Sequence, residues 1–303
     1  MSTTPSNRRL WLLLLTLPPL FWAGNALVGR AVVGQVPPLA LSFWRWVVAL
    51  VLVLPFTWRE IAANLPMLGR RWRVVAALGI TSVGAYNTLL YLAVQSTTAV
   101  NATLVGASMP VMILALGAFW LGQPIGPRQL FGILVSLIGL LVVVTKGEPE
   151  LLMRLEFTAG DGLMLLATLS WAVYSVMLKR FPLPIGGLAL LTVLIAVGLV
   201  AILPAYLWEL ANGAFMAPGW RAPAAILYTA TLPSLAAYYL WNRGVAEVGA
   251  ALAGQYSYLL PMFTAALAVA LLGEPFRWHH AVGGLLIFTG IALASGFGSR
   301  RTR

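Results

Sequence analysis

The 303-residue chain contains no cysteine and few charged residues. Without cysteine it forms neither a disulfide nor a thiolate metal site. Charged residues make up 9% of the sequence and hydrophobic residues 60%, whereas a soluble globular domain is about 25% charged. Such a composition cannot cover a water-facing surface, so we expect an integral membrane protein that contacts the lipid bilayer.

Acidic side chains are also scarce, and all eight lie in predicted loops or at the ends of predicted spans. The sequence shows no Ser–His–Asp set, metal-ligand cluster or pair of intramembrane carboxylates, so it predicts no enzyme, metal or cofactor. The two histidines, His279 and His280, are neighbours. Adjacent side chains on a helix diverge by about 100°, which makes a poor chelate.

The net charge is +11, but the basic residues do not form the patch that nucleic-acid binding requires. They occupy short gaps between apolar runs, as topology determinants do. With the N-terminus inside, thirteen fall on the cytoplasmic side and Arg45 falls within a span. The outside receives only Arg30, Lys146, Arg154, Arg221 and Arg277. We therefore predict no nucleic-acid partner and a multi-pass protein of the cytoplasmic (inner) membrane with both termini in the cytoplasm.

A hydrocarbon core about 30 Å thick is crossed by about 20 helical residues. Ten apolar runs predict ten such spans, with Trp58–Arg73 as the loop after the second. The predicted spans are Leu10–Val28, Leu39–Thr57, Val74–Val94, Ala99–Leu121, Arg128–Val144, Asp161–Leu178, Gly187–Leu207, Ala222–Trp241, Gly249–Leu272 and Trp278–Phe297.

The chain reads as one five-helix unit written twice. The block Gly106–Gly139 recurs 151 residues later, with Pro110 matching Pro261 and L-G-Q-P matching L-G-E-P. Likewise Trp22 falls on Trp171, 149 residues on. We predict repeats at 1–147 and 161–303, joined by a linker at 148–160. Because five is odd, the second repeat enters the membrane from the opposite face, which is the inverted topology typical of secondary transporters.

These features resemble the EamA-type transporters of the drug/metabolite transporter superfamily: ten spans, an early F-W-A-G-N helix, an Arg in span two and paired P…L-G-[Q/E]-P…G…G blocks. The resemblance covers nearly the whole chain. It implies export or exchange of small metabolites, commonly amino acids, and is greatest to bacterial amino-acid exporters, including aromatic ones. Glu274 matches the family pattern and Gln123 departs from it.

Polar and aromatic residues near mid-span predict a cavity, because such groups are costly in hydrocarbon. By contrast, Tyr91, Tyr239, Trp241 and Asn242 lie near predicted span ends, so we assign them to the interfacial belts. The candidate substrate-binding residues are Trp22, Asn25, Tyr86, Asn87, Gly106, Trp171, Tyr174, Ser175, Tyr238, Ser257 and Tyr258.

Two prolines and one arginine have two interpretations each. Pro110 and Pro261 free the carbonyls of Gly106 and Ser257, which can bind a substrate ammonium, or they simply kink the helices. Arg45 can contact a substrate carboxylate. We favour the alternative, in which its side chain extends to the headgroups or fixes helix ends.

The sequence therefore predicts an alternating-access exporter or exchanger of neutral or aromatic amino acids or similar small metabolites. It has no buried carboxylate to carry a proton. A nucleotide sugar or phosphorylated sugar is the alternative substrate, but it needs several basic cavity residues. A membrane-embedded enzyme and a narrow channel are further alternatives. The sequence does not fix the oligomeric state, and a monomer is compatible with it.

Overall fold

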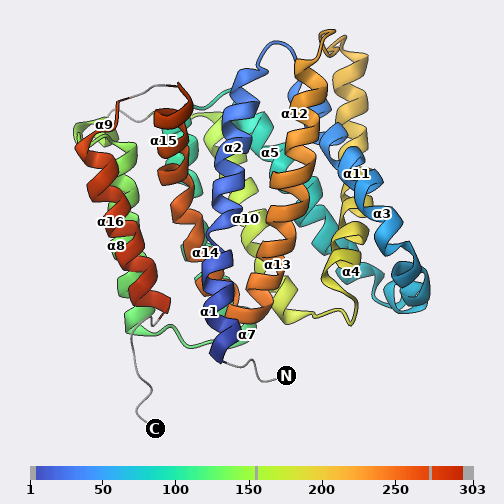
Figure 1. The fold of residues 1–303 in the computed structure, drawn as a ribbon, viewed down its shortest axis with the longest axis horizontal. Helices are drawn as coiled ribbons and strands as arrows, with labels where there is room; N and C mark the ends of the chain where they lie inside the picture. Colours follow the sequence, from blue (N-terminus) through green and yellow to red (C-terminus); the bar gives the residue numbers. More distant parts are fainter. Residues whose placement is uncertain (1–4, 154–155, 273–274, 296–303) are drawn as a thin grey trace.

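A computed structural model describes residues 5–153, 156–272 and 275–295. Within these ranges all regular secondary structure is helical. Nine helical stretches there are long and apolar enough to cross a membrane. They run alongside one another in a single bundle (Figure 1). The predicted all-helical membrane class is therefore confirmed.

The first half of the chain forms eight α-helices and one π-helix. They are α1 (Pro5–Leu14), α2 (Leu17–Ala31), α3 (Pro38–Arg70), α4 (Trp72–Gly79), the π-helix η1 (Ile80–Tyr86), α5 (Asn87–Ala93), α6 (Ala99–Gly106), α7 (Met109–Leu121) and α8 (Pro127–Val144). The turn between α7 and α8 depends on Gly122, whose φ of 61° is left-handed and therefore suits glycine.

A short helix, α9 (Glu150–Met153), lies in the predicted linker. The second half again contains a π-helix between two α-helices. Its helices are α10 (Ala159–Arg180), α11 (Gly187–Ala211), α12 (Arg221–Thr229), the π-helix η2 (Ala230–Ala236), α13 (Ala237–Val248), α14 (Ala250–Gln255), the 3-10 turn η3 (Tyr256–Tyr258), α15 (Leu259–Leu272) and α16 (Trp278–Ser295).

Helix α3 corrects one prediction. We expected a loop over Trp58–Arg73, but the helix continues to Arg70 and contains both Pro55 and Pro66. Good helix formers such as Ala, Leu and Glu dominate this extension. Most of its side chains are exposed, so the helix extends past the apolar run without burying charge.

The predicted eighth span, Ala222–Trp241, corresponds to the continuous helical stretch from α12 through η2 to α13. It is not among the nine candidate spans. Its tyrosines, threonines and Pro233 lower its mean hydropathy, and much of one face packs inside the bundle.

Both predicted proline sites coincide with an interruption of the helix. The α6–α7 helix is broken at Ala107 and Ser108, just before Pro110, and the 3-10 turn η3 ends three residues before Pro261. The sequence did not predict the two π-helices, which are seven residues long and start 150 residues apart. Such segments are rare and are frequently found at functional sites.

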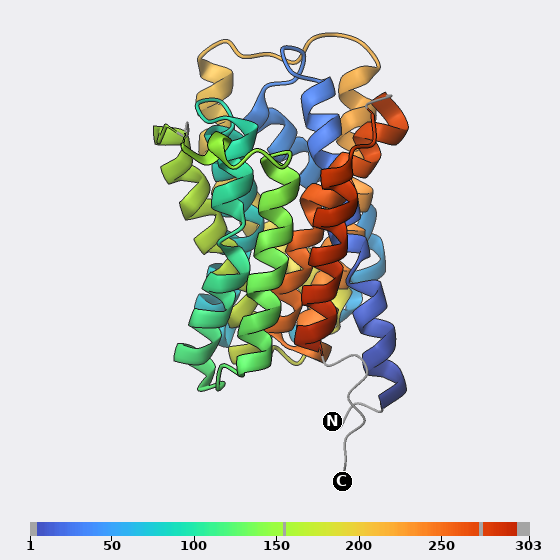
Figure 2. The same cartoon turned by 90° about the vertical axis from the view of Figure 1, so that its left-hand side faces the viewer.

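Helices α8 and α16 lie side by side (Figure 2), and their contact is reciprocal. A Cβ added to Gly139 would lie 2.6 Å from the carbonyl oxygen of Gly283, and Gly132 meets Gly290 in the same way. The Oγ of Ser136 donates to the carbonyl of Ile287 between them. Positions 132, 136 and 139 correspond to 283, 287 and 290 at the offset of 151. Gly132 therefore contacts the residue equivalent to Gly139, and Gly139 contacts the residue equivalent to Gly132.

Helices α3 and α11 show the same reciprocity at their ends. The Glu209 carboxylate, on α11, accepts from the backbone N–H groups of Leu39 (3.0 Å) and Ala40 (2.7 Å) at the start of α3. The Glu60 carboxylate, on α3, accepts from the N–H of Gly186 (2.6 Å), which caps the start of α11. Glu60 and Glu209 are 149 residues apart, so each helix supplies an acid that satisfies the other's N-terminal donors.

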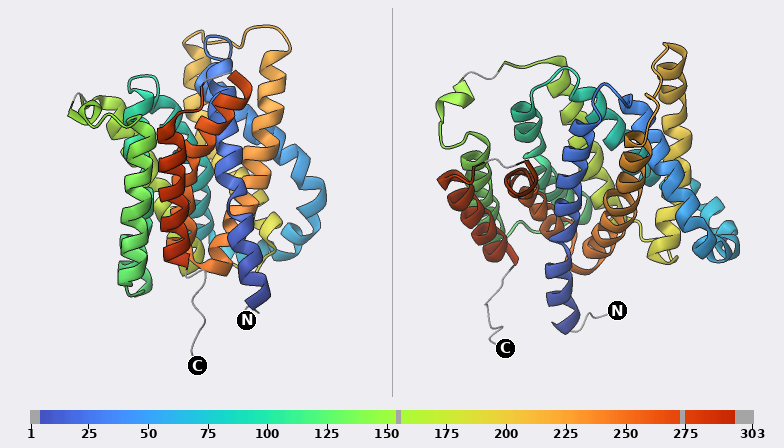
Figure 3. Two further views of the ribbon diagram at one scale, coloured as in Figure 1. Left: turned by 60° about the vertical axis from the view of Figure 1, so that its left-hand side comes forward. Right: turned by 45° about the horizontal axis from the view of Figure 1, so that its top comes forward.

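The start of α1 and the end of α16 lie at the same end of the bundle (Figure 3). Arg8 Nη2 donates to the carbonyl of Ser295 over 3.2 Å. The structure places these segments together. That this end faces the cytoplasm remains a prediction.

Candidate functional site

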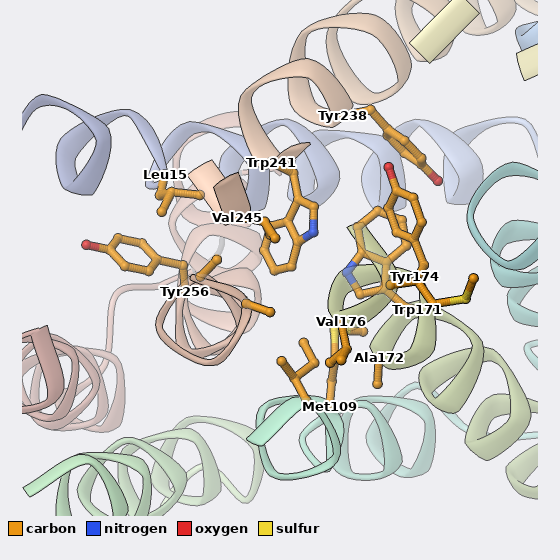
Figure 4. Close-up of a cluster of buried hydrophobic side chains, with 14 of the residues drawn as sticks. Leu15, Met109, Trp171, Ala172, Tyr174, Val176, Tyr238, Trp241, Val245 and Tyr256 are labelled. Carbon is orange, nitrogen blue, oxygen red and sulfur yellow. The ribbon is translucent and has the colours of Figure 1, made fainter. Parts of the chain in front are cut away.

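Six large aromatic side chains meet in the interior of the bundle, and we call them the aromatic cluster. Trp171 lies at its centre. Its ring centroid is 4.9 Å from that of Tyr86, 5.0 Å from Tyr238 and 5.2 Å from Tyr174. Two further indoles complete it, Trp22 at 5.3 Å and Trp241 at 5.5 Å. Figure 4 shows how α10 and α13 direct four of these side chains toward one another.

Helical spacing explains why these side chains share one location. Trp171, Tyr174 and Ser175 stand at positions i, i+3 and i+4 of α10, so they lie on one face. Tyr238 and Trp241 have the same relation on α13. Those four aromatic side chains are nearly or fully buried, which means that protein rather than lipid surrounds them.

A hydrogen-bond network joins the cluster to its neighbours. Asn87 Nδ2 donates to the Tyr238 hydroxyl over 2.8 Å, and Trp241 Nε1 donates to Ser175 Oγ over 3.2 Å. The Tyr174 hydroxyl bonds to Asn242 Oδ1. These bonds hold the rings in fixed orientations.

Each π-helix supplies a backbone acceptor to the cluster. Trp22 Nε1 donates to the carbonyl of Pro233 in η2 over 3.1 Å, and the Tyr238 hydroxyl donates to the carbonyl of Ser82 in η1 over 3.3 Å. A π-turn displaces carbonyls from the regular α-helical ladder. The two unpredicted π-helices therefore have a visible role, because their carbonyls anchor cluster side chains.

The assignment of Trp241 and Asn242 to the interfacial belt was wrong. Trp241 is fully buried against Trp22 and Trp171, and Asn242 is buried against Tyr174. Helix α13, in the predicted eighth span, continues to Val248, so these residues lie well inside the helix rather than at its end.

Several buried polar atoms in this region have no hydrogen-bond partner within the described protein. They include Asn25 Oδ1, Trp171 Nε1 and Asn242 Nδ2 next to the cluster, and the Tyr258 hydroxyl in the same core. Each unmade bond costs about 1–3 kcal/mol. Gln255 is fully buried with both ends of its amide unpaired. The site thus offers both donors and acceptors to a polar ligand.

Arg45 is 1% exposed, so its side chain does not extend to the headgroups, which was one half of the structural alternative that we favoured. Its Nε donates to Ser234 Oγ over 3.0 Å and its Nη1 donates to the Tyr91 hydroxyl over 2.9 Å. The guanidinium also lies 4.9 Å from the ring centroid of Trp46. Neutral oxygens leave its charge uncompensated, and we identify no carboxylate paired with it in the described ranges.

The other predicted residues lie around the cluster rather than in it. Gly106 faces α10, where an added Cβ would be 3.2 Å from the Met164 Cε. Ser257 uses its hydroxyl locally, donating to the carbonyl of Gly254 over 2.7 Å. The sequence-based search missed Trp46, which is fully buried and packs 4.9 Å from Tyr238. Its position beside the intraspan Arg45 was the signal that could have found it.

The histidine pair also differs from expectation. The Nε2 atoms of His279 and His280 are 3.1 Å apart, so the rings converge at the start of α16. The Nδ1 of His280 accepts from the N–H of Arg277. No group of three or more ligating side chains is found in the part of the chain that the structure describes, and Glu274 lies outside that part.

The fold defines a multi-pass helical membrane protein. The EamA-like transporter family matches the chain at residues 9–145 and again at 158–296, so the chain belongs to this family. An uncharacterized transporter of Archaeoglobus fulgidus is 29% identical over 284 residues, which cover 93% of this chain and 96% of that one.

Two further relatives carry more specific names. A "Probable terminal-alkyne amino-acid exporter" of Streptantibioticus cattleyicolor is 28% identical over 95% of this chain and 93% of its own. A "Probable amino-acid metabolite efflux pump" of Salmonella typhimurium is 26% identical over 95% of this chain and 96% of its own. A solved crystal structure has the same fold, with a TM-score of 0.74 at 22% identity, covering 96% of this chain and 99% of that one.

Proposed function

We propose that this protein is an alternating-access transporter that exports or exchanges amino acids or similar small metabolites across the inner membrane. The aromatic cluster, with the unpaired polar groups beside it, is its substrate site. The observation that carries the proposal is the pairing of Trp22 with Trp171 at the centre of the bundle. These residues occupy matching positions in the two halves of the sequence, so both halves contribute to one site.

The proposal includes ten spans in two inverted repeats, residues 1–147 and 161–303 with a linker at 148–160. Several observations support it. The family matches the chain twice, and the π-helices recur at an offset of 150 residues. The glycine contacts of α8 with α16 and the glutamate caps of α3 and α11 are reciprocal. A two-fold axis in the membrane plane produces such exchange between oppositely oriented halves.

The chemistry of the site suits a zwitterion with an uncharged side chain. Apolar rings surround a few amide, indole and hydroxyl groups, which is the usual composition of a small-molecule site. Arg45 and its neighbours are the candidate partners of a substrate carboxylate. The carbonyls of Gly106 and Ser257 beside the two interrupted helices are candidate partners of the ammonium group, and Pro110 and Pro261 cause those interruptions.

We also propose that the substrate gradient, rather than a proton, drives transport. Among the acids that the structure describes, Asp161 and Glu209 are the buried ones, and each lies at the end of a helix. Asp161 accepts from Thr97, Asn101 and Thr158 at the start of α10. Glu209 accepts from two backbone groups. These bonds give both acids structural roles away from the aromatic cluster.

A substrate panel with purified protein in liposomes tests the function. We expect saturable uptake of one or more neutral amino acids, with the same rate whether or not a pH gradient is imposed. A rate that rises several-fold with the pH gradient would refute substrate-gradient coupling. Transport restricted to nucleotide sugars or phosphorylated sugars would favour the alternative substrate class.

A further inference from the structure

A second site lies at the surface, away from the aromatic cluster. The corner between α3 and α4 faces the loop after α10 across a pocket of about 710 Å³. Four arginines line it: Arg70, Arg71, Arg73 and Arg180. The α3–α4 corner lies at the end of the bundle where α1 begins (Figure 1), and the pocket is lined by residues from both halves of the chain.

Within the part of the chain that the structure describes, we identify no acidic partner for these four guanidinium groups. The ion pair identified within the described ranges joins Arg243 to Glu247. Glu60, on the same helix as Arg70, accepts from the N–H of Gly186 and forms no ion pair with these arginines in the described ranges. Arg71 Nη1 donates to the carbonyl of Pro182 over 3.1 Å, which ties the two walls together without neutralising the charge. Like charges so close together repel one another, and a bound anion relieves that repulsion.

Exposed aromatic rings stand beside the arginines. Trp72 is 61% exposed and Phe181 is 38% exposed. Arg73 lies 5.6 Å from the Trp72 ring and Arg180 lies 5.3 Å from the Phe181 ring. Trp72 begins one candidate span and Arg180 ends another. The pocket is thus level with the lipid headgroups, where an apolar tail can lie along the rings while an anionic head enters between the arginines.

We propose that this pocket binds the phosphate group of an anionic phospholipid. Guanidinium groups bind phosphate through paired, charge-assisted hydrogen bonds. Basic pockets between membrane helices on the cytoplasmic side are suited to anionic headgroups, and that leaflet is the anionic one. The bound lipid bridges the α3–α4 corner and the α10–α11 loop, so it also stabilises the contact between the two halves.

Native mass spectrometry of the purified protein tests this inference. Phosphatidylglycerol and phosphatidylcholine with the same acyl chains are titrated, and glycerol phosphate serves as the soluble source of the same chemistry. We expect selective retention of phosphatidylglycerol and no retention of glycerol phosphate at equal concentration. Equal retention of both lipids would overturn the proposal. If glycerol phosphate bound as tightly as the lipid, the ligand would be a soluble phosphate rather than a phospholipid, which would also overturn it.

Variants of the pocket provide the second arm. The double variant Arg70→Gln with Arg73→Gln should weaken phosphatidylglycerol binding about 25-fold, at about fivefold per arginine. Arg128→Gln removes an exposed charge from the start of α8 at the same end of the molecule, outside the pocket, and should change binding little. An equal loss in Arg128→Gln would show that only overall charge matters and would overturn the proposal. If the double variant does not fold, Arg180→Gln carries the same test from the other wall.

Discussion

Replacing Glu209 with alanine tests the reciprocal pairing of α3 and α11. The Glu209 side chain is 7% exposed and accepts from two backbone N–H groups at the start of α3. Its counterpart Glu60 is exposed and accepts from one N–H group. The two acids therefore form a matched pair for comparison: they occupy equivalent positions in the two halves, but Glu209 is buried and Glu60 is exposed.

The structure sets the expected size of the effect. In Glu209→Ala two buried N–H groups lose their acceptors, at about 1–3 kcal/mol each. The helix terminus also loses a favourable negative charge, worth about 0.3–1 kcal/mol. We expect a loss of about 2–7 kcal/mol in the free energy of unfolding. Glu209→Gln keeps one acceptor oxygen and should fall between alanine and the native residue, whereas Glu60→Ala should change little because water replaces its bond.

Unfolding of the purified variants in the same detergent, followed by circular dichroism against denaturant, measures these differences. The expected order of stability is native protein and Glu60→Ala first, then Glu209→Gln, then Glu209→Ala. If Glu209→Ala were as stable as the native protein, the two bonds would contribute nothing. If Glu60→Ala lost as much as Glu209→Ala, burial would not govern the effect.

Two further substitutions test the packing and the site. Gly139→Ala places a Cβ 2.6 Å from the Gly283 carbonyl oxygen and should destabilise the protein by about 1–3 kcal/mol in the same denaturation assay. The control Gly162→Ala places its Cβ in open space and should not destabilise it. Equal stability of the two variants would contradict the close packing of α8 on α16. Arg45→Gln should raise the KM for a carboxylate-bearing substrate at least tenfold in liposome uptake. The exposed control Arg59→Gln should leave the KM unchanged. An unaltered KM in Arg45→Gln would show that this arginine does not contact the substrate.

The sequence predicted the helical membrane class of the protein. Glycine and proline in register also led us to propose an internal duplication, because they leave a pattern that apolar composition does not hide. The match of Trp22 with Trp171 also led to the centre of the aromatic cluster. Both residues stand in short motifs that recur near the start of each half, and their rings meet in the structure.

The parts that the sequence did not predict depend on tertiary contacts. The π-helix η1 packs where Gly84 approaches α11 closely, with an added Cβ only 3.0 Å from the Ala201 Cβ, and no local pattern marks such a segment. The extension of α3 was missed because we assumed that the helix ends where the apolar run ends, at Thr57, whereas it continues to Arg70. The same assumption placed Trp241 and Asn242 at the end of a span, whereas the longer helix buries them in the site.

Counterflow in liposomes tests the central claim most directly. Liposomes containing the purified protein are loaded with an excess of unlabelled neutral amino acid, selected from the substrate panel, and labelled amino acid is added outside. A carrier with one central site that opens alternately to each side should accumulate label transiently above equilibrium, and this accumulation should saturate. Trp22→Ala and Trp171→Ala should each reduce it at least tenfold while both variants remain folded. Uptake that rises linearly with concentration and is insensitive to the internal load, or undiminished counterflow in both tryptophan variants, would contradict the account.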